Sequence, residues 1–167
     1  MTRSLRAAVI GLGSMGANHA RVLSDTPGVE LVAVADANPA AVNKTIAGRP
    51  IPGFPDAATL LRETRPDMVS IVVPTQLHEE VALQAIAAGA NVLVEKPIAA
   101  TLDAARRIAV AAEQAGLVLT VSLPGHPSLG AEDGGDIASA VHRIGERDLP
   151  STRDPTEIDR FQVHPLE

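Results

Sequence analysis

Three glycines near the start of the chain have the spacing of a phosphate-binding turn. Gly11, Gly13 and Gly16 form a G-x-G-x-x-G pattern between the apolar run 7–10 and a helical pattern. In such a unit the first glycine permits the tight turn, the second lets the backbone approach a pyrophosphate, and the third lets helix and strand pack closely. We therefore expect a dinucleotide site here, the alternative being an ordinary glycine-rich turn.

An acidic residue follows the glycines at the distance expected of a ribose ligand. Asp36 ends the second apolar run, and the ribose-binding acid of dinucleotide sites lies about 20 residues beyond the last glycine. The same charge would repel a 2′-phosphate, and no arginine immediately follows to reverse the sign. We expect NAD rather than NADP. The alternative role of Asp36 is to cap the following helix.

A second group of chemically capable residues should lie on the same edge of the sheet. Pro74, Thr75 and His78 follow one apolar run, and Glu95 and Lys96 follow the next. In open α/β sheets, ligands bind outside the carboxyl ends of the strands. The order of residues therefore predicts that both segments border one ligand-binding cleft.

Lys96 is the candidate catalytic residue of this group. A lysine at a cleft can act as general acid or base when a hydroxyl is oxidised to a carbonyl. Pro97 restricts the residue before it to an extended backbone, which limits where the lysine side chain points. The alternative is a surface ion pair between Glu95 and Lys96, the commoner outcome for these residue types alone.

Short β-branched runs alternate with longer alanine-rich segments from residue 6 to residue 122. This alternation predicts an α/β fold, a Rossmann-type doubly wound parallel sheet with helices on both faces. The expected strands are 7–10, 30–35, 68–73, 91–94 and 118–121, and the expected helices are 15–24, 39–47, 56–63, 77–88 and 102–115. Asn38 before Pro39 indicates a helix start, and Gly89 and Gly116 indicate helix ends. In the last helix, the expected buried face consists of Leu102, Ala105, Ile108, Ala109 and Ala112.

The pattern changes after residue 122. Residues 123–167 contain five prolines, five glycines, four arginines and nine acidic residues. We expect a dinucleotide-binding domain over 1–122 and an irregular, partly disordered tail over 123–167. Within this tail, Ile137, Val141 and Ile144 have the spacing of one short amphipathic helix.

Composition narrows the class of protein further. The net charge is −6, and Phe54 and Phe161 are the only Phe, Tyr or Trp residues, so we expect no nucleic-acid partner. Cysteine is absent, which excludes thiolate chemistry. No run approaches the ~20 apolar residues of a membrane span. We expect a cytoplasmic protein with no membrane partner and no metal site.

These motifs together resemble the N-terminal domain of the Gfo/Idh/MocA oxidoreductase family, which includes glucose-fructose oxidoreductase and inositol dehydrogenase. The resemblance covers residues 5–122, and its most specific element is the Glu-Lys-Pro triplet. The residues that carry it are Gly11, Gly13, Gly16, His19, Asp36, Pro74, Thr75, His78, Glu95, Lys96 and Pro97. Of these, His19 has no assigned role, since a single histidine on a helix is more often a packing or surface residue than a ligand.

The resemblance implies specific contacts with the cofactor. Ser14 and Met15 would lie against the pyrophosphate, and Asp36 on the adenosine ribose. Glu95 would lie near the nicotinamide ribose, and Lys96 would contact the nicotinamide carboxamide and the reacting hydroxyl. The other cofactor-binding residues it implies are Pro74, Thr75 and His78.

The resemblance also implies an NAD(P)-dependent oxidoreductase that transfers hydride between NAD and a hydroxyl of a sugar, polyol or nucleotide sugar. Family members continue into a large, mostly β substrate domain, so we expect this chain to carry only the cofactor-binding half. Its activity alone is then uncertain, and the alternatives are a non-catalytic nucleotide-binding module or an inactive fragment. Formation of a homo-oligomer stays open.

Overall fold

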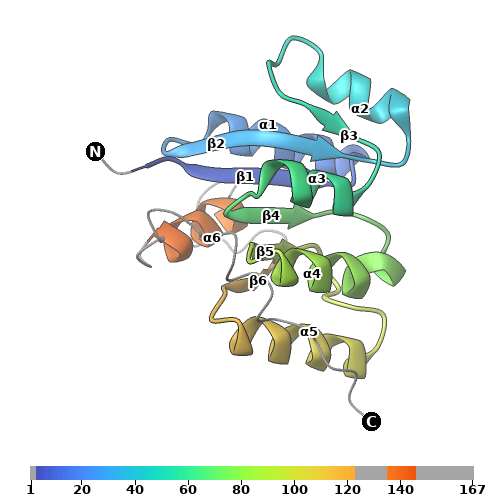
Figure 1. Cartoon of the computed structure of the whole chain (residues 1–167), viewed down its shortest axis with the longest axis vertical. Coiled ribbons are helices and arrows are strands. Elements are labelled where there is room, and N and C mark those ends of the chain that lie inside the picture. Colours follow the sequence, from blue (N-terminus) through green and yellow to red (C-terminus); the bar gives the residue numbers. More distant parts are fainter. Residues whose placement is uncertain (1–2, 123–134, 146–167) are drawn as a thin grey trace.

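The computed structural model describes residues 3–122 and 135–145, and these residues build one parallel sheet with helices on both of its faces (Figure 1). The strands are β1 (Leu5–Ile10), β2 (Val29–Ala35), β3 (Gly53–Phe54), β4 (Met68–Ile71), β5 (Asn91–Val94) and β6 (Leu119–Val121). The helices are α1 (Ser14–Asp25), α2 (Pro39–Ile46), α3 (Ala57–Thr64), α4 (His78–Ala87), α5 (Leu102–Gln114) and α6 (Gly135–Gly145). A 3-10 turn, η1 (Thr75–Leu77), precedes α4.

The strand order confirms the Rossmann-type doubly wound sheet. It is β3-β2-β1-β4-β5-β6, with every pair parallel. The chain therefore winds outward from β1 in one direction and then returns to add β4 on the other side. That reversal between β1 and β4 is the switch point at which doubly wound sheets bind ligands.

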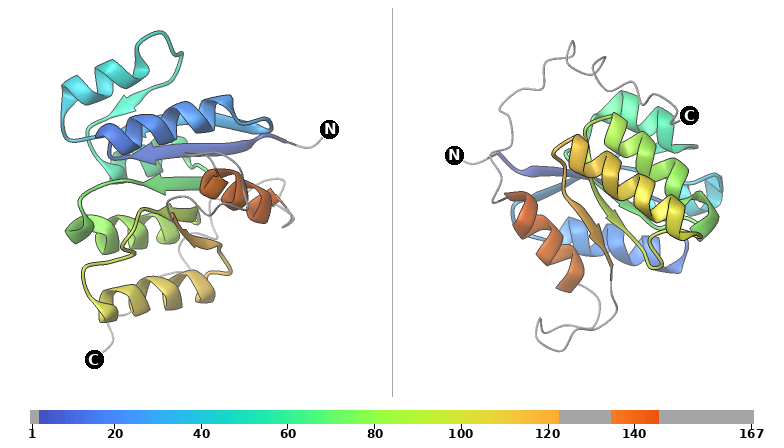
Figure 2. Two further views of the ribbon diagram at one scale, coloured as in Figure 1. Left: turned by 180° about the vertical axis from the view of Figure 1, so that it is seen from behind. Right: turned by 90° about the horizontal axis from the view of Figure 1, so that it is seen from below.

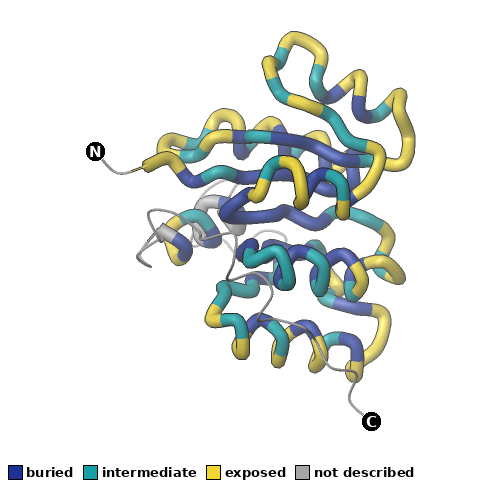
Figure 3. Tube along the Cα trace, viewed as in Figure 1, coloured by how far each residue is buried: buried dark blue, intermediate teal, exposed yellow. Residues whose placement is uncertain are grey.

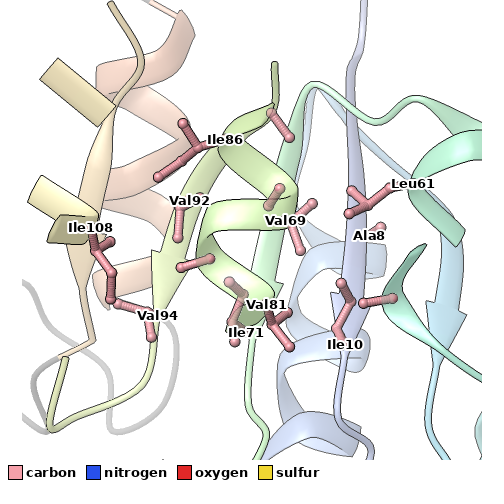
Figure 4. Close-up of a cluster of buried hydrophobic side chains, with 14 of the residues drawn as sticks. Ala8, Ile10, Leu61, Val69, Ile71, Val81, Ile86, Val92, Val94 and Ile108 are labelled. Atoms are coloured by element: carbon pink, nitrogen blue, oxygen red, sulfur yellow. The ribbon is translucent and has the colours of Figure 1, made fainter. Parts of the chain in front are cut away.

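One face of the sheet is covered by α3, α4 and α5 (Figures 1 and 4). Alternate strand residues such as Ile10, Ile71 and Val94 point to this side and meet Val81 and Ile108 of the helices. The central strands β1, β4 and β5 are buried almost throughout, whereas the outer surfaces of the helices are exposed (Figure 3). This two-sided burial explains why the strand sequences are nearly continuous apolar runs.

The other face of the sheet is covered by α1, α2 and α6. Figure 2 shows α1 and α6 together on the side opposite to α3, α4 and α5. The segment predicted to form a short amphipathic helix contains α6, with Ile137 and Ile144 buried and Val141 half-buried. It packs with Met68 and Leu93 of the sheet. The expectation of an irregular, partly disordered tail concerns residues outside the described ranges, α6 excepted.

Two details differ from the expectations. The two-residue strand β3 was not predicted, because a strand this short shows no periodic pattern in the sequence. Its first residue is Gly53, where a Cβ atom would collide with the Val42 side chain of α2. The predicted buried face of α5 was wrong in part. Ala104, Ile108 and Ala112 are buried, whereas Leu102 and Ala109 are exposed. Leu102 opens the helix directly after its cap, Thr101, and is 67% exposed there.

Candidate cofactor site

The glycine pattern occupies the turn between β1 and α1. Gly11 has a φ of +92°, a conformation that L side chains rarely adopt, and a Cβ here would collide with the backbone carbonyl of Val72. A Cβ at Gly16 would collide with the carbonyl of Gly11. At Gly13, by contrast, a Cβ would have nothing within 4 Å. Two glycines are therefore needed by the fold, and the third is free to face a ligand.

The first turn of α1 presents backbone donors at the same place. Gly13 is the N-cap residue and has no side chain to cap the helix, and the first helical hydrogen bond runs from Ala17 N–H to Gly13 O at 2.9 Å. The N–H groups before Ala17 have no partner within the helix. Ser14 and Met15 are exposed, and Met15 is 50% exposed. This arrangement suits an anion such as pyrophosphate.

Asp36 lies next to the glycine turn, at the end of β2. Its Oδ2 accepts the Leu12 N–H at 2.6 Å and its Oδ1 accepts the Asn38 N–H at 2.7 Å. The N-cap of α2 is Asn38, whose side chain accepts the Ala40 N–H. Asp36 is thus not the capping residue. Its half-buried carboxylate is fixed beside the phosphate-binding turn, with lone pairs still available for ribose hydroxyls.

Residues after β4 lie at the same edge of the sheet, next to the glycine turn after β1. Pro74 is exposed and Thr75 is half-buried in η1. His78 is different, because it is only 1% exposed and its ring nitrogens lie 2.9 Å from Pro97 O and 2.9 Å from Val73 O. The ring therefore ties the segment after β4 to the segment after β5. Its nitrogens already contact backbone, so a cofactor would meet the residues that His78 holds rather than the ring nitrogens.

The Glu-Lys-Pro segment leaves the end of β5. Glu95 N–H extends the sheet by donating to Ile71 O at 3.0 Å, and the Lys96 N–H donates to Glu95 Oε2 at 3.2 Å. The Lys96-Pro97 peptide bond is cis. Glu95 is half-buried, whereas Lys96 and Pro97 are exposed. The lysine side chain is thus exposed at the carboxyl edge of the sheet.

His19 is a site residue to which the sequence assigned no role. It is 3% exposed on α1, its Nδ1 lies 2.8 Å from Ser70 Oγ, and its Nε2 lies 3.2 Å from Glu95 Oε1. The spacing of Gly16, His19, Ala20 and Leu23 marks one buried helix face, a signal that could have placed His19 inside. The two partners of its ring could not have been read from local sequence.

The candidate residues of the four segments after β1, β2, β4 and β5 are thus brought to one edge of the sheet, around its switch point. A family model described as "Oxidoreductase family, NAD-binding Rossmann fold" matches residues 5–123. The chain belongs to this Gfo/Idh/MocA oxidoreductase family. Its membership confirms the resemblance drawn from the motifs and the assignment of NAD as the cofactor.

Curated relatives that match this chain include inositol 2-dehydrogenases. Inositol 2-dehydrogenase from Arthrobacter sp. (strain FB24) is 38% identical over 120 residues, covering 70% of this chain and 35% of the relative. Inositol 2-dehydrogenase from Pseudomonas fluorescens (strain Pf-5) is 38% identical over 110 residues, covering 63% of this chain and 32% of the relative. This chain therefore spans about a third of the length of the curated relatives it matches.

Solved structures of other proteins align with about the same share of the chain. GenD2 from gentamicin A biosynthesis, crystallised with NAD, aligns with a TM-score of 0.69 and 35% identity over 73% of this chain and 35% of that protein. The WlbA dehydrogenase from Bordetella pertussis, crystallised with NADH and UDP-GlcNAcA, aligns with a TM-score of 0.68 and 28% identity. That alignment covers 72% of this chain and 36% of WlbA.

The glycine turn fits the family cofactor. Gly13 leaves open space above the turn, the uncapped start of α1 supplies donors, and the Asp36 carboxylate stands beside them. Within residues 3–122 and 135–145, no three His, Asp or Glu side chains gather as metal ligands would. In the same ranges, no helix has the length and apolar character needed to cross a membrane.

Proposed function

We propose that this chain binds NAD at the carboxyl edge of its sheet and supplies the cofactor-binding part of a dehydrogenase acting on a sugar, polyol or nucleotide sugar. The observation that carries the proposal is the anchoring of Asp36. Its carboxylate accepts backbone N–H groups from the glycine turn and from the start of α2. A ribose-binding acid is thereby held in place beside a phosphate-binding turn before any ligand arrives.

The cofactor would extend across the switch point. Pyrophosphate would bind at Gly13, Ser14 and Met15, where exposed residues surround the start of α1. Pro74 and Thr75 would border the cofactor from the far side of the turn, since they begin the segment after β4, the neighbour of β1. His78 would act indirectly, by holding the backbone of these two segments together.

Asp36 should also select NAD against NADP. A 2′-phosphate on the adenosine ribose would approach a fixed carboxylate, and two unit charges of like sign 4 Å apart repel by about 4 kcal/mol at an effective dielectric constant of 20. The carboxylate cannot turn away without losing the two N–H groups that it accepts. This support is electrostatic and independent of the family assignment.

Lys96 is the residue we propose for proton transfer. NAD, when bound, would supply the hydride acceptor for oxidation of the carbon that bears the reacting hydroxyl. The Lys96 Nζ would hold that hydroxyl and take its proton, which is the ordinary role of a general base in alcohol oxidation. The exposed lysine, at the same edge as the glycine turn, is available to a substrate that enters from solvent or is brought by another protein surface.

The substrate class is proposed from the relatives, among which are inositol 2-dehydrogenases and a dehydrogenase bound to UDP-GlcNAcA. A second candidate is a nucleotide-binding module without catalysis. Lys96 is exposed, and a cofactor bound without a positioned substrate forgoes the proximity effect, roughly 7–11 kcal/mol of the barrier.

Calorimetric titration of the purified chain with NADH and NADPH tests cofactor binding. We expect NADH to bind at least tenfold more tightly than NADPH, since that ratio needs only about 1.4 kcal/mol of discrimination. Asp36→Asn keeps the side-chain shape but removes the charge, and should shrink the ratio. Asp103→Asn, on the exposed start of α5, is the matched control and should leave it unchanged. A wild-type chain that binds neither nucleotide would refute the proposal.

Turnover distinguishes the two candidate functions. Wild type and Lys96→Met are assayed for NADH formation against inositols, hexoses and nucleotide sugars. Turnover that Lys96→Met abolishes supports the dehydrogenase, whereas NADH binding with no turnover on any substrate supports the binding module.

A further inference from the structure

His19 is the one buried polar side chain on the inner face of α1. Its neighbours on that face are Gly16, Ala20 and Leu23, which are buried as expected for a helix packed on a sheet. A polar ring in this position is costly unless its nitrogens are hydrogen-bonded. The ring is in fact bonded on both sides, so its partners indicate what the histidine does.

The two partners of the ring assign its hydrogen. A carboxylate can only accept, so His19 Nε2–H must donate to Glu95 Oε1, 3.2 Å away. A hydroxyl can donate or accept, and Ser70 Oγ is hydrogen-bonded with Nδ1 across 2.8 Å. The contact with Glu95 therefore fixes the hydrogen on Nε2, whichever direction the Ser70 bond takes. Ser70, His19 and Glu95 thus form a hydrogen-bonded relay. Its first residue, Ser70, is fully buried in β4 and is therefore held in place by the sheet.

The relay ends on a carboxylate whose second oxygen is also occupied. Glu95 Oε2 accepts the Lys96 N–H at 3.2 Å, and only 14% of the Glu95 side chain is exposed. A carboxylate held at both oxygens can still accept further hydrogen bonds, because each oxygen has two lone pairs. Glu95 is thus fixed in direction and open to a ligand at the edge.

Glu95 and Asp36 are anchored in the same way at two ends of the site. Each carboxylate has one oxygen bonded to its own turn and the other bonded to the β1–α1 unit, through Leu12 for Asp36 and through His19 for Glu95. They follow β2 and β5, which are three strand spacings apart in the sheet, or roughly 14 Å. A dinucleotide spans both halves of a doubly wound sheet, so each carboxylate can serve one ribose.

We propose that His19 is a positioning residue, which together with Ser70 aims the Glu95 carboxylate at the ribose of the second nucleotide, the one that Asp36 does not hold. This inference rests on the proposed binding of NAD. Through this relay the helix that binds the pyrophosphate also sets the geometry at the reacting end. Without the Nε2–H donor, Glu95 would rotate into solvent and lose its ribose contact, while the adenosine end would be unaffected.

Two ligands distinguish the adenosine end of the site from the end that would bind the second ribose. ADP carries the adenosine and the pyrophosphate but no second ribose, whereas NADH carries all three. We expect His19→Asn, whose amide is too short to reach Glu95, to weaken NADH binding about tenfold, the size of one hydrogen bond to a charged group. ADP affinity should stay within about twofold, well below the effect of losing one such bond.

Matched variants identify the contact responsible. His19→Gln places an amide N–H near the position of Nε2 and should recover most of the NADH affinity. Ser70→Ala removes only the support of the ring and should give an intermediate loss. His142→Gln, at an exposed histidine of α6, is the control. In two-dimensional NMR spectra, the Lys96 amide signal should move in His19→Asn and not in the control.

The outcomes are distinct. Equal weakening of NADH and ADP by His19→Asn would mean a general structural role, and no weakening of NADH would mean no role; either result overturns the inference but leaves NAD binding intact. A wild-type chain that binds neither ligand overturns both proposals. If His19→Asn does not fold, Glu95→Gln replaces it in the same comparison, with the same loss expected for NADH alone.

Discussion

Gly13 and Gly16 lie three residues apart in the same turn, yet a methyl group would meet very different surroundings at the two positions. A Cβ at Gly16 would collide with the carbonyl oxygen of Gly11, whereas a Cβ at Gly13 would stand in open space. The backbone of Gly13, with φ −61° and ψ −169°, is also accessible to any residue. The folding role and the binding role of the glycine pattern are therefore separable.

We predict that Gly13→Ala keeps the melting temperature of the chain but weakens NADH binding at least tenfold, because the new methyl group occupies the path of the pyrophosphate. Gly16→Ala should instead lower the free energy of unfolding by about 1–3 kcal/mol or more, as overpacking does. Thermal melts and NADH titrations of both variants check this. A Gly13→Ala chain with unchanged affinity would show that the pyrophosphate does not bind at the turn.

Spacing predicted the positions of Asp36 and Glu95, because their place in the chain follows from the strand-turn-helix repeat. It could not predict that both carboxylates are held by donors from the β1–α1 unit. The Leu12 N–H is a backbone group with no signature in sequence, and His19 meets Glu95 only because α1, which packs on β1 and β2, brings its ring within reach of β4 and the end of β5. The positions of Asp36 and Glu95 were thus predictable from the sequence, whereas the groups that hold their carboxylates in place were not.

Helix starts are where local sequence and structure agree most directly. The structure places Asn38, Asp56 and Thr101 as N-caps of α2, α3 and α5, and each side chain accepts a backbone N–H from the first turn. Asn38 with Pro39 was predicted as a helix start. Gly89 and Gly116, predicted as helix ends, have φ angles of +75° and +65°. These signals involve neighbours in sequence, so no tertiary contact is needed to recognise them.

Asp56 provides a test at this scale. The Thr59 backbone N–H and hydroxyl hold the pKa of the Asp56 carboxyl below its ordinary value. A pKa that is lower in the folded chain stabilises above the unfolded value, about 4, and this stabilisation is lost as the pH falls through the folded value. Asp56→Ala should lower the melting temperature at pH 7, and its difference from wild type should shrink below about pH 4.

The matched control for Asp56→Ala is Asp25→Ala, at the end of α1, whose carboxylate pairs with the exposed Arg21. Its melting temperature should stay close to that of wild type at pH 7, as expected for a surface ion pair. A difference for Asp56→Ala that is constant from pH 7 to pH 2 would argue against the charged cap.

The pattern of α5 shows the limit of helical periodicity. Small apolar residues occur on several sides of this helix, so more than one face shows the apolar spacing of a buried helix face. The sheet and α4 select Ala104, Ile108 and Ala112. Likewise, β3 is a strand only because its two residues pair with two residues of β2. Both features depend on a partner distant in sequence, which periodicity alone cannot supply.

At the scale of the whole molecule, α6 completes the cover of the sheet. It packs beside α1 against the α1 face of β4 and β5, and Figures 1 and 2 place it toward the end of the sheet opposite to the cofactor edge. Ile137 and Ile144, each 1% exposed, share one core with Met68 and Leu93. This helix therefore contributes to the stability of the Rossmann sheet.

We predict that Ile137→Ala lowers the free energy of unfolding by about 2–4 kcal/mol, through lost burial and the cavity left in the core. Urea denaturation followed by circular dichroism measures it. Affinity for NADH should be unchanged, since α6 lies away from the glycine turn. Val110→Ala on α5, where the side chain is 46% exposed, should change the unfolding free energy by no more than about 0.5 kcal/mol. Equal effects of the two substitutions would contradict the packing of α6.

The sequence by itself determined the alternation of strands and helices, the phosphate-binding turn, the ribose acid and the Glu-Lys-Pro segment. Each depends on residues close together in the chain, where spacing alone fixes geometry. Only the tertiary structure decided that Asn38 rather than Asp36 caps α2, and that His78 connects the backbone after β4 with the backbone after β5. It also decided that His19 contacts Glu95 and that α6 packs against the sheet. These contacts join groups from separate elements, and they exist only after the sheet has assembled and brought those elements together.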